Sequence, residues 1–424
     1  MSPATLRRGW CPGVLRPMPT GDGLLVRLRL TSGELSGRLA ADIAGLAERY
    51  GNGAIDLTQR ANLQLRGVRE DVLPALTAAL GDLDLLDPSD SAESVRNMMV
   101  SPLAGIDPFC ADGRALAKNL ETILLRKIAL HALPAKFGFA VDGGGLWPLG
   151  DVGADITLIA PGPGDGWRIR LGGSPSLSQP IEAAEATGQV ARLAQIFLSK
   201  SSTAGFRRMR DLVANDGAAN IFSEAGLLVS NAGLAVGKRA TPEAGGHRFS
   251  ADACIAAIGL PFGRIEASKL KPIAALAGPR AALRLTPWRL LIVRCADEAA
   301  VTAILAKAPA LGLVTTPGDV RLAIDACTGA PGCVNATTPT REDAILIAGV
   351  LGQDHLKPGT IHVSGCIKGC ARRGTARVTL VGRDGRYDLV VNGGPSDAPV
   401  RTAIACGDLA AAVRSALAVA GGAA

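Results

Sequence analysis

Aromatic residues and histidines are scarce in this sequence. Phe, Trp and Tyr make up 3% of the 424 residues, and four histidines are present. No uninterrupted apolar run approaches the roughly 18 residues needed to cross a membrane. The first residues, Met1–Cys11, lack the apolar core of a secretory signal. The sequence therefore predicts a cytoplasmic protein that neither spans a membrane nor is exported.

Nucleic-acid-binding signatures are also missing, although the formal net charge is +7. The basic residues occur singly and in pairs, and few aromatic side chains are present to stack on bases. A dispersed positive charge suits a small polyanionic ligand held in a cleft. A solvated surface that happens to be basic is the plainer alternative. We therefore expect no nucleic-acid partner.

Four cysteines form the most specific pattern in the chain. Five residues separate Cys327 from Cys333, thirty-two separate the two pairs, and three separate Cys366 from Cys370. The total of nine cysteines is odd, and without an export signal it indicates metal ligation in place of disulfides. Four thiolates are what a [4Fe–4S] cluster needs. A structural zinc site is an alternative, although zinc sites mostly use spacers of two to four residues, and bystander thiols are a third.

The second half of the chain repeats the first, and the length allows two to four domains. A helix over about 35–50 and a strand over 54–58 form a small layer in the first copy. Three collinear segment pairs, at offsets of 228, 222 and 220 residues, carry the repeat: 57–66 with 285–294, 154–159 with 376–381, and 171–176 with 391–396. At an offset near 226, Ser101 falls opposite Cys327, so only one copy holds the four cysteines.

The cysteine spacing and the duplication together resemble the sulfite and nitrite reductase superfamily. The resemblance implies an α+β fold of mixed sheets and helices with internal pseudo-twofold symmetry. It divides the chain into ferredoxin-like half-domains at 1–85 and 237–310 and reductase-type domains at 86–236 and 311–424. The last of these would carry the cluster. In the reductases the final cysteine of the set joins the cluster to a sirohaem iron, a role that would fall to Cys370.

The anion-binding loop departs from the reductase pattern. The reductases carry a loop of the type Leu-Pro-Arg-Lys-Phe-Lys, and here it is Leu133–Gly138. Lys136 is retained, but Ala135 and Gly138 replace the other two cations. Because six-electron reduction of a small oxyanion needs dense positive charge, the loss argues for different chemistry. The segments 9–13, 135–145 and 362–370 resemble instead the precorrin-3B synthase branch of the superfamily.

That resemblance implies an oxidoreductase of aerobic cobalamin biosynthesis. The expected reaction is oxygen-dependent hydroxylation of precorrin-3A at C20 with lactone formation, using a [4Fe–4S] cluster, a non-haem iron, O2 and NADH. The run Gly162–Gly166 lacks the strand–GxGxxG–helix setting of a dinucleotide site, so we expect a separate reductase to deliver the electrons. The alternatives are a sirohaem-dependent nitrite or sulfite reductase and a non-catalytic cluster or tetrapyrrole carrier.

A substrate with many carboxylates should be held by arginines, which pair with carboxylates bidentately. The resemblance places Arg60, Arg96 and Lys136 in the catalytic pocket, because segments 57–64 and 94–97 look like the arginine-bearing motifs of the reductases. The candidate substrate contacts are Arg60, Arg66, Arg96, Lys136, Arg207, Arg208, Lys368, Arg372 and Arg373. For each of them, an ordinary surface cation is the alternative.

The ligands of the implied non-haem iron are not evident. In a two-His-one-carboxylate site, one histidine and the carboxylate usually lie close in sequence. None of His131, His247, His355 and His362 is followed two residues later by Asp or Glu. His362, four residues before Cys366, is the one near the cysteines, and a core or surface histidine is the more ordinary interpretation. Cys11 is a further candidate.

Overall fold

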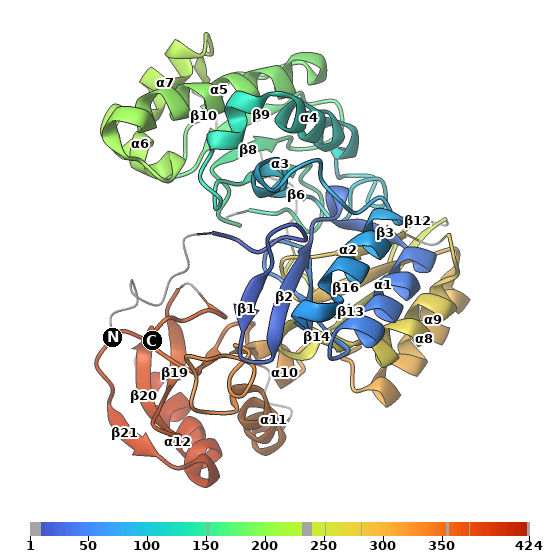
Figure 1. Cartoon of the computed structure of the whole chain (residues 1–424), viewed down its shortest axis with the longest axis vertical. Coiled ribbons are helices and arrows are strands. Elements are labelled where there is room, and N and C mark those ends of the chain that lie inside the picture. Colours follow the sequence, from blue (N-terminus) through green and yellow to red (C-terminus); the bar gives the residue numbers. More distant parts are fainter. Residues whose placement is uncertain are drawn as a thin grey trace.

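The computed structural model describes residues 10–150, 152–230, 240–250, 252–280, 282–352, 356–372 and 374–421 (Figure 1). Four sheets organise these residues: two of five strands that share one core with helices, a third of six strands and a fourth of five. The order of elements is mixed, with both parallel and antiparallel pairs, so the predicted α+β class is confirmed. Within these residues, no helix is long and apolar enough to cross a membrane.

Two five-stranded sheets form what we call the half-domain body, and each takes one strand from the other copy. The first sheet runs β1 (Met18–Thr20), β2 (Gly23–Leu28), β5 (Leu63–Val68), β4 (Ala54–Leu57) and β14 (Arg264–Glu266). The second runs β12 (Gly245–Ser250), β13 (Ala253–Gly259), β16 (Leu290–Cys295), β15 (Ala282–Leu285) and β3 (Glu34–Ser36). Because β3 and β14 are exchanged, the two copies share one core.

That core lies under two equivalent helices, α1 (Gly37–Tyr50) and α8 (Ala267–Ala277). Helix α1 begins where the Ser36 side chain accepts a hydrogen bond from the Leu39 amide, a normal N-cap. Its buried face carries Ala40, Ile43, Ala44 and Ala47, spaced by three and four residues. The helix expected over 35–50 and the strand expected over 54–58 are therefore confirmed, with ends shifted by one or two residues.

The other two sheets belong to two larger domains. The first large domain contains β6 (Met98–Val100), β7 (Phe139–Asp142), β8 (Ile156–Ile159), β9 (Arg168–Leu171), β10 (Leu177–Ser178) and β11 (Val229–Ser230). The cysteine domain contains β17 (Ile324–Ala326), β18 (Ile361–Ser364), β19 (Ala376–Arg383), β20 (Arg386–Gly393) and β21 (Arg401–Ile404). Figure 1 shows the two domains on different sides of the half-domain body.

Strand register reproduces the sequence repeat in these domains. Phe139 pairs with Ile156 in the first large domain, and Ile361 pairs with Val378 in the cysteine domain. The two paired residues of the cysteine domain each lie 222 residues after their counterparts in the first large domain, so the 222-residue offset of the sequence repeat is also a structural equivalence. In each domain three parallel strands are followed by an antiparallel pair.

The remaining helices cover the outer faces of the sheets and connect their strands. In the half-domain body these are α2 (Leu73–Gly81) and α9 (Glu298–Lys307). The first large domain has α3 (Asp90–Val95), α4 (Arg114–Arg126), α5 (Ala183–Ala204), α6 (Met209–Asp216) and α7 (Ala218–Glu224). The cysteine domain has α10 (Val320–Ala323), α11 (Thr340–Leu351) and α12 (Leu409–Gly421). The predicted domain limits, 1–85, 86–236, 237–310 and 311–424, stay predictions. The limit at 236/237 lies outside the described residues, the limit at 310/311 falls within the 3-10 helix Ala308–Leu311, and β3 and β14 cross between the half-domains.

Candidate active site

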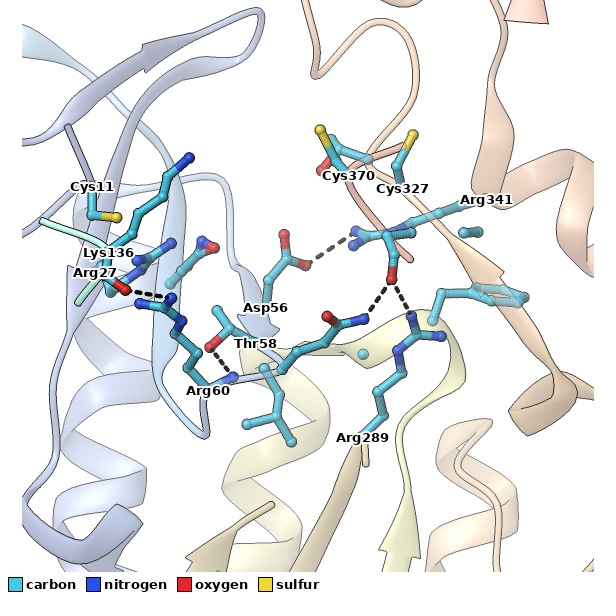
Figure 2. Close-up of a pocket in the computed structure, with 18 residues that line it drawn as sticks. Cys11, Arg27, Asp56, Thr58, Arg60, Lys136, Arg289, Cys327, Arg341 and Cys370 are labelled. Carbon is cyan, nitrogen blue, oxygen red and sulfur yellow. Dashed lines mark hydrogen bonds and ion pairs between the residues drawn. The ribbon is translucent and has the colours of Figure 1, made fainter. Parts of the chain in front are cut away.

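A cleft opens between the half-domain body and the cysteine domain, with one side chain added by the loop before β7 (Figure 2). Its volume is about 350 Å³, which lies within the range of small-molecule sites. Cys327 and Cys370 line it from the cysteine domain, Arg27 and Arg60 from the half-domain body, and Lys136 from the loop. Thiols and cations from distant parts of the chain therefore share one cavity.

The four predicted ligand cysteines lie on loops at the ends of β17 and β18. Cys327 follows β17, and its Sγ accepts a hydrogen bond from the Gly365 amide at 3.2 Å. Cys333, Cys327 and Cys366 are half-buried, while Cys370 is exposed at the cleft. A Cβ added at Gly365 would lie 2.6 Å from the Ala336 side chain, so the backbone at this loop is closely packed.

The four thiols lie close enough for their charges to influence one another. Although part of Cys370 is exposed at the cleft, the surrounding protein desolvates its thiol and raises its pKa to about 11, and the neighbouring Cys327, Cys366 and Cys333 add to the increase. Burial also raises the pKa of Cys366, with the same thiols contributing. Iron would relieve that repulsion, because a bound thiolate gives its charge to the metal. Four converging thiols with an amide donor directed at sulfur fit a [4Fe–4S] cluster by their donor chemistry.

The thiols do not form a closed mononuclear site. Among the described residues, no group of three or more His, Cys, Asp or Glu side chains is arranged to hold a metal ion. A cubane places one iron at each thiolate, so its ligands stand further apart than those of a single zinc ion.

The other copy keeps the backbone of this site but has lost its sulfur. The Cys327 amide donates to the Val363 carbonyl at 3.2 Å, and the Ser101 amide donates to the Val141 carbonyl at 3.0 Å. The Gly143 amide donates to Ser101 Oγ at 2.9 Å, as the Gly365 amide does to Cys327 Sγ. Ser101 therefore occupies the position of Cys327, as the sequence repeat predicted.

The matching cleft in that copy is filled with apolar side chains. Thr58 Oγ1 accepts a hydrogen bond from the Arg60 amide, and Thr286 Oγ1 accepts one from the Trp288 amide, each at 3.2 Å. Trp288 thus stands where the first copy has Arg60. Its indole packs against Leu149 and against a group of buried hydrophobic side chains that includes Trp147. Within the described residues, the duplicated frame presents one chemical site.

Two of the predicted basic residues line the cleft. Arg60 Nη2 donates to the Lys136 carbonyl oxygen at 3.0 Å, which ties the half-domain body to the loop that carries the lysine. In that loop the Gly138 amide donates to Asp155 Oδ2 at 2.9 Å, and no side chain replaces the missing cation. Arg60 and Lys136 therefore stand where a ligand in the cleft can contact them.

Other predicted contacts are occupied elsewhere. Arg96 pairs with Asp87 at 2.9 Å and Glu121 at 3.7 Å and does not line the cleft. Arg207 borders a separate cavity beside α5, and Arg208 pairs with Asp155 at 2.9 Å. Arg372 pairs with Asp325 at 3.0 Å. Lys368 lies on the cysteine loop, where its charge lowers the pKa of Cys370 against the effect of burial, and Arg373 lies outside the described residues.

Arg66 supports the cysteine loop from behind. Its Nη2 donates to the Gly332 carbonyl oxygen at 2.8 Å, directly before Cys333, and to Asp22 at 2.6 Å. The side chain is buried. The same β5 residue that the sequence offers as a substrate contact is therefore placed to position the loop of one cluster ligand.

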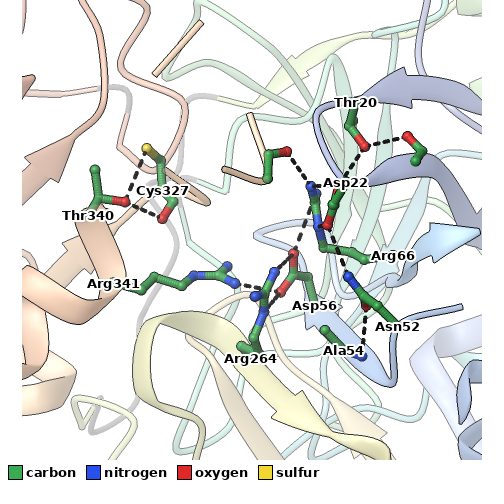
Figure 3. Close-up of polar contacts among 12 residues, drawn as sticks. Thr20, Asp22, Asn52, Ala54, Asp56, Arg66, Arg264, Cys327, Thr340 and Arg341 are labelled. Atoms are coloured by element: carbon green, nitrogen blue, oxygen red, sulfur yellow. Dashed lines mark hydrogen bonds and ion pairs between the residues drawn. The ribbon is translucent and has the colours of Figure 1, made fainter. Parts of the chain in front are cut away.

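Residues that sequence reasoning missed complete the cleft: Arg27, Asp56, Gln59, Arg289 and Arg341. Asp56 is the centre of a network that Figure 3 shows, with Arg264 at 2.7 Å, Arg341 at 3.1 Å and Arg66 at 3.8 Å. Burial alone would raise the pKa of Asp56, but Arg341, Arg264 and Arg66 lower it to about 2. The alternation of charged and apolar residues in the strand 23–30 could have indicated that Arg27 leaves the core. No local sequence pattern indicates that Arg341 reaches the cleft.

None of the described histidines lines this cleft. His362 is fully buried on β18, neither ring nitrogen has a hydrogen-bond partner, and burial lowers its pKa to about 4. His131 contacts Ser91 and the Leu124 carbonyl, and His247 packs on Trp147. His355 lies outside the described residues. A two-His-one-carboxylate site is therefore not formed by the described part of the chain, and Cys11 is the remaining non-cluster thiol of the cleft.

Comparison with known proteins agrees with this geometry. A relative from Sinorhizobium sp, named precorrin-3B synthase, is 36% identical over 409 residues, covering 93% of this chain and 85% of the relative. The chain belongs to the precorrin-3B synthase family. Members of that family and the reductases below are enzymes.

More distant relatives connect the precorrin-3B synthase family to the reductases. A ferredoxin–nitrite reductase from Synechococcus elongatus is 28% identical, covering 90% of this chain and 80% of the relative. Residues 16–83 match the nitrite/sulfite reductase ferredoxin-like half domain. The solved structure of Mycobacterium tuberculosis NirA superposes with a TM-score of 0.74 at 21% identity, covering 92% of this chain and 79% of that one. The predicted reductase-like fold is thereby confirmed.

Replacing Asp56 by Asn should destabilise the protein by about 3–5 kcal/mol, because Arg66, Arg264 and Arg341 would lose their buried counter-charge. The folded-state pKa of Asp56 is depressed to about 2, so its contribution is present above the unfolded value near 4 and is lost as pH falls from about 4 to 2. Urea unfolding at neutral pH and near pH 3 measures both effects. Asp71→Asn, at an exposed carboxylate paired with Arg69, is the control; equal stability of the two variants would refute the role of Asp56.

Proposed function

We propose that this protein is a precorrin-3B synthase: it hydroxylates precorrin-3A at C20 with O2 and closes a lactone with the ring A acetate, in aerobic cobalamin biosynthesis. The observation that carries the proposal is the common cleft, where the thiols of Cys327 and Cys370 face Arg60 and Lys136. The balance takes NADH, H⁺ and O2, places one oxygen atom in the macrocycle and releases the other as water.

The four cysteines would hold a [4Fe–4S] cluster, which supplies single electrons when bound. The chain's own contribution is to bind and orient the macrocycle. Arg60 and Lys136 can pair with its carboxylates, and Thr58 fixes the turn that presents Arg60 by accepting hydrogen bonds from the amides of Arg60 and Asn62. The mononuclear iron implied by the family has no ligand set among the described residues, so no step is assigned to it.

A sirohaem-dependent reductase of nitrite or sulfite is supported less well. Its small oxyanion would need several unpaired cations at one point. Here Ala135 and Gly138 remove two from the loop, and Arg289 and Arg341 are paired with Asp325 at 2.6 Å and Asp56 at 3.1 Å. The other cations of the cleft, Arg27, Arg60 and Lys136, lie across from the thiols, which suits the carboxylates of a larger ligand.

The cluster assignment predicts iron and acid-labile sulfide in the protein purified without oxygen. The expected content is about four of each per chain, with the absorption of a cubane and no sirohaem bands. Cys366→Ala should lose the cluster, whereas Cys110→Ala, which changes a buried cysteine of the other copy, should retain it. Sirohaem in equal amount to the protein would favour the reductase, and zinc without iron would refute both assignments.

Lys136→Met should raise the KM for precorrin-3A by about 10–100-fold, because a charge-assisted contact contributes roughly 1.5–3 kcal/mol. The kcat should change less, since the lysine is proposed to bind the substrate. Initial rates of product formation with enzymatically generated precorrin-3A provide the measurement. Arg207→Gln, in the separate cavity, is the matched control. An effect at Arg207 as large as that at Lys136 would place the substrate outside the cleft.

NADH should not support turnover by the purified protein alone. The Gly162–Gly166 run connects β8 and β9, an antiparallel pair, and this is not the setting of a dinucleotide fingerprint. A separate flavin-type reductase should restore product formation. NADH oxidation coupled to product in its absence would show that the electron donor binds directly. Cluster and tetrapyrrole binding without product under O2 and reductant would instead support the carrier alternative.

A further inference from the structure

The two sides of the cleft differ in how their cations are neutralised. On the side that we call the cysteine side, Arg341 pairs with Asp56 at 3.1 Å and Arg289 pairs with Asp325 at 2.6 Å. On the side that we call the β2 side, Figure 2 shows Cys11, Arg27, Arg60 and Lys136 gathered away from Cys327 and Cys370. Three cations of the cleft thus lie together on the side opposite the thiols.

Arg27 is the exceptional cation on the β2 side. Its neighbours in β2, Val26 and Leu28, are in the core, so the alternation of a strand turns Arg27 toward the cleft. Its guanidinium forms no ion pair with a carboxylate among the described residues, and its Nε is out of solvent with no hydrogen-bond partner. Cys11 lines the cleft on the same side.

Arg29, two residues further along the chain, differs from Arg27 in having a carboxylate partner. Arg29 is buried and pairs with Glu93 at 3.2 Å. Arg27 has no such carboxylate, and burial together with the charges of Arg29 and Arg60 lowers its pKa to about 10 even though Cys11 acts in the opposite direction. Holding a guanidinium in these surroundings is costly unless an anion joins it. Among the described residues, the chain supplies that anion for Arg29 and no carboxylate for Arg27.

We propose that Arg27 is the main carboxylate anchor of the cleft, and that a bound tetrapyrrole turns an acidic edge to the β2 side and the opposite edge to Cys370. The inference rests on the proposed function for the class of ligand. A carboxylate is the matching group because it meets a guanidinium through two parallel hydrogen bonds. Arg60 and Lys136 surround the same place and add attraction, while the neutralised cysteine side accepts the less charged part of the macrocycle.

Binding of a stable polycarboxylate tetrapyrrole tests the anchor directly. The probe is uroporphyrin III, compared with its octaamide, which keeps the shape and removes the charges; fluorescence titration of the cluster-loaded protein gives both Kd values. Arg27→Gln should weaken uroporphyrin binding at least tenfold and leave octaamide binding unchanged. Arg27→Lys should lose less affinity, because it keeps the charge but not the bidentate geometry. Arg69→Gln, at an exposed arginine paired with Asp71, is the control.

Several results would overturn the proposal. Unchanged uroporphyrin affinity in Arg27→Gln would do so, and so would equal losses for uroporphyrin and the octaamide, because the residue would then only shape the cleft. Thermal unfolding checks that each variant is folded, and Arg27→Lys stands in if the glutamine variant is not. The KM of Arg27→Gln for precorrin-3A is the second measurement. An unchanged KM with normal product formation would refute the role of Arg27 as an anchor and leave the proposed function intact. If the parent protein forms no product with electron donor, O2 and precorrin-3A, the proposed function is refuted. The titrations with uroporphyrin and its octaamide would still test whether Arg27 binds a carboxylate.

Discussion

The buried carboxylate of Asp56 is the charge on which the arrangement of the cleft depends. It lies on β4 and meets arginines from β5, from the exchanged strand β14 and from α11 of the cysteine domain. A buried carboxylate is costly without partners, so its ionised form requires these four elements to stay together. Arg66 extends the network to the Gly332 carbonyl beside Cys333. Packing of the half-domain body and placement of a cluster ligand are thus coupled through one carboxylate.

Duplication gave the protein a symmetric frame, and a few substitutions made it asymmetric. Ser101 and Cys327 have the same backbone partners and the same amide donor, but the hydroxyl replaces the thiolate ligand that a cluster requires. Trp288 replaces Arg60, and it fills with Leu149 the space that remains open in the other copy. The copy without the four cysteines is packed at this position and supports the other copy, which holds the cleft.

Charge within the cleft separates two tasks. Next to the thiols, Asp56 and Asp325 neutralise the arginines, so an electron-transfer group there would not compete with substrate anions for cations. The opposite side of the cleft is lined by three cations, Arg27, Arg60 and Lys136. The reductase loop has two further cations, and Ala135 and Gly138 replace them here. Under the proposed function Arg27, Arg60 and Lys136 would meet the carboxylates of a tetrapyrrole, which agrees with membership of the precorrin-3B synthase family.

The sequence alone determined the features that are local or periodic. Helix α1, strand β4, the reductase-like class and the repeat offsets were predictable, because hydrophobic period and duplicated segments are written along the chain. The cysteine spacing likewise pointed to a cluster. Ser101 opposite Cys327 followed from the offset and recurs in the hydrogen bonds.

Tertiary structure decided which cations face a ligand. Arg96 lies in a segment that resembles a reductase motif, yet it pairs with Asp87 and Glu121. Arg27 lies outside these motifs, yet it lines the cleft and has no carboxylate partner among the described residues. Arg341 is 285 residues from the Asp56 that neutralises it. An arginine's residue type and strand position are local, but its counter-ion comes from whatever the fold packs beside it. Since that neighbour decides whether a charge is neutralised or available, the binding surface is a property of the folded chain.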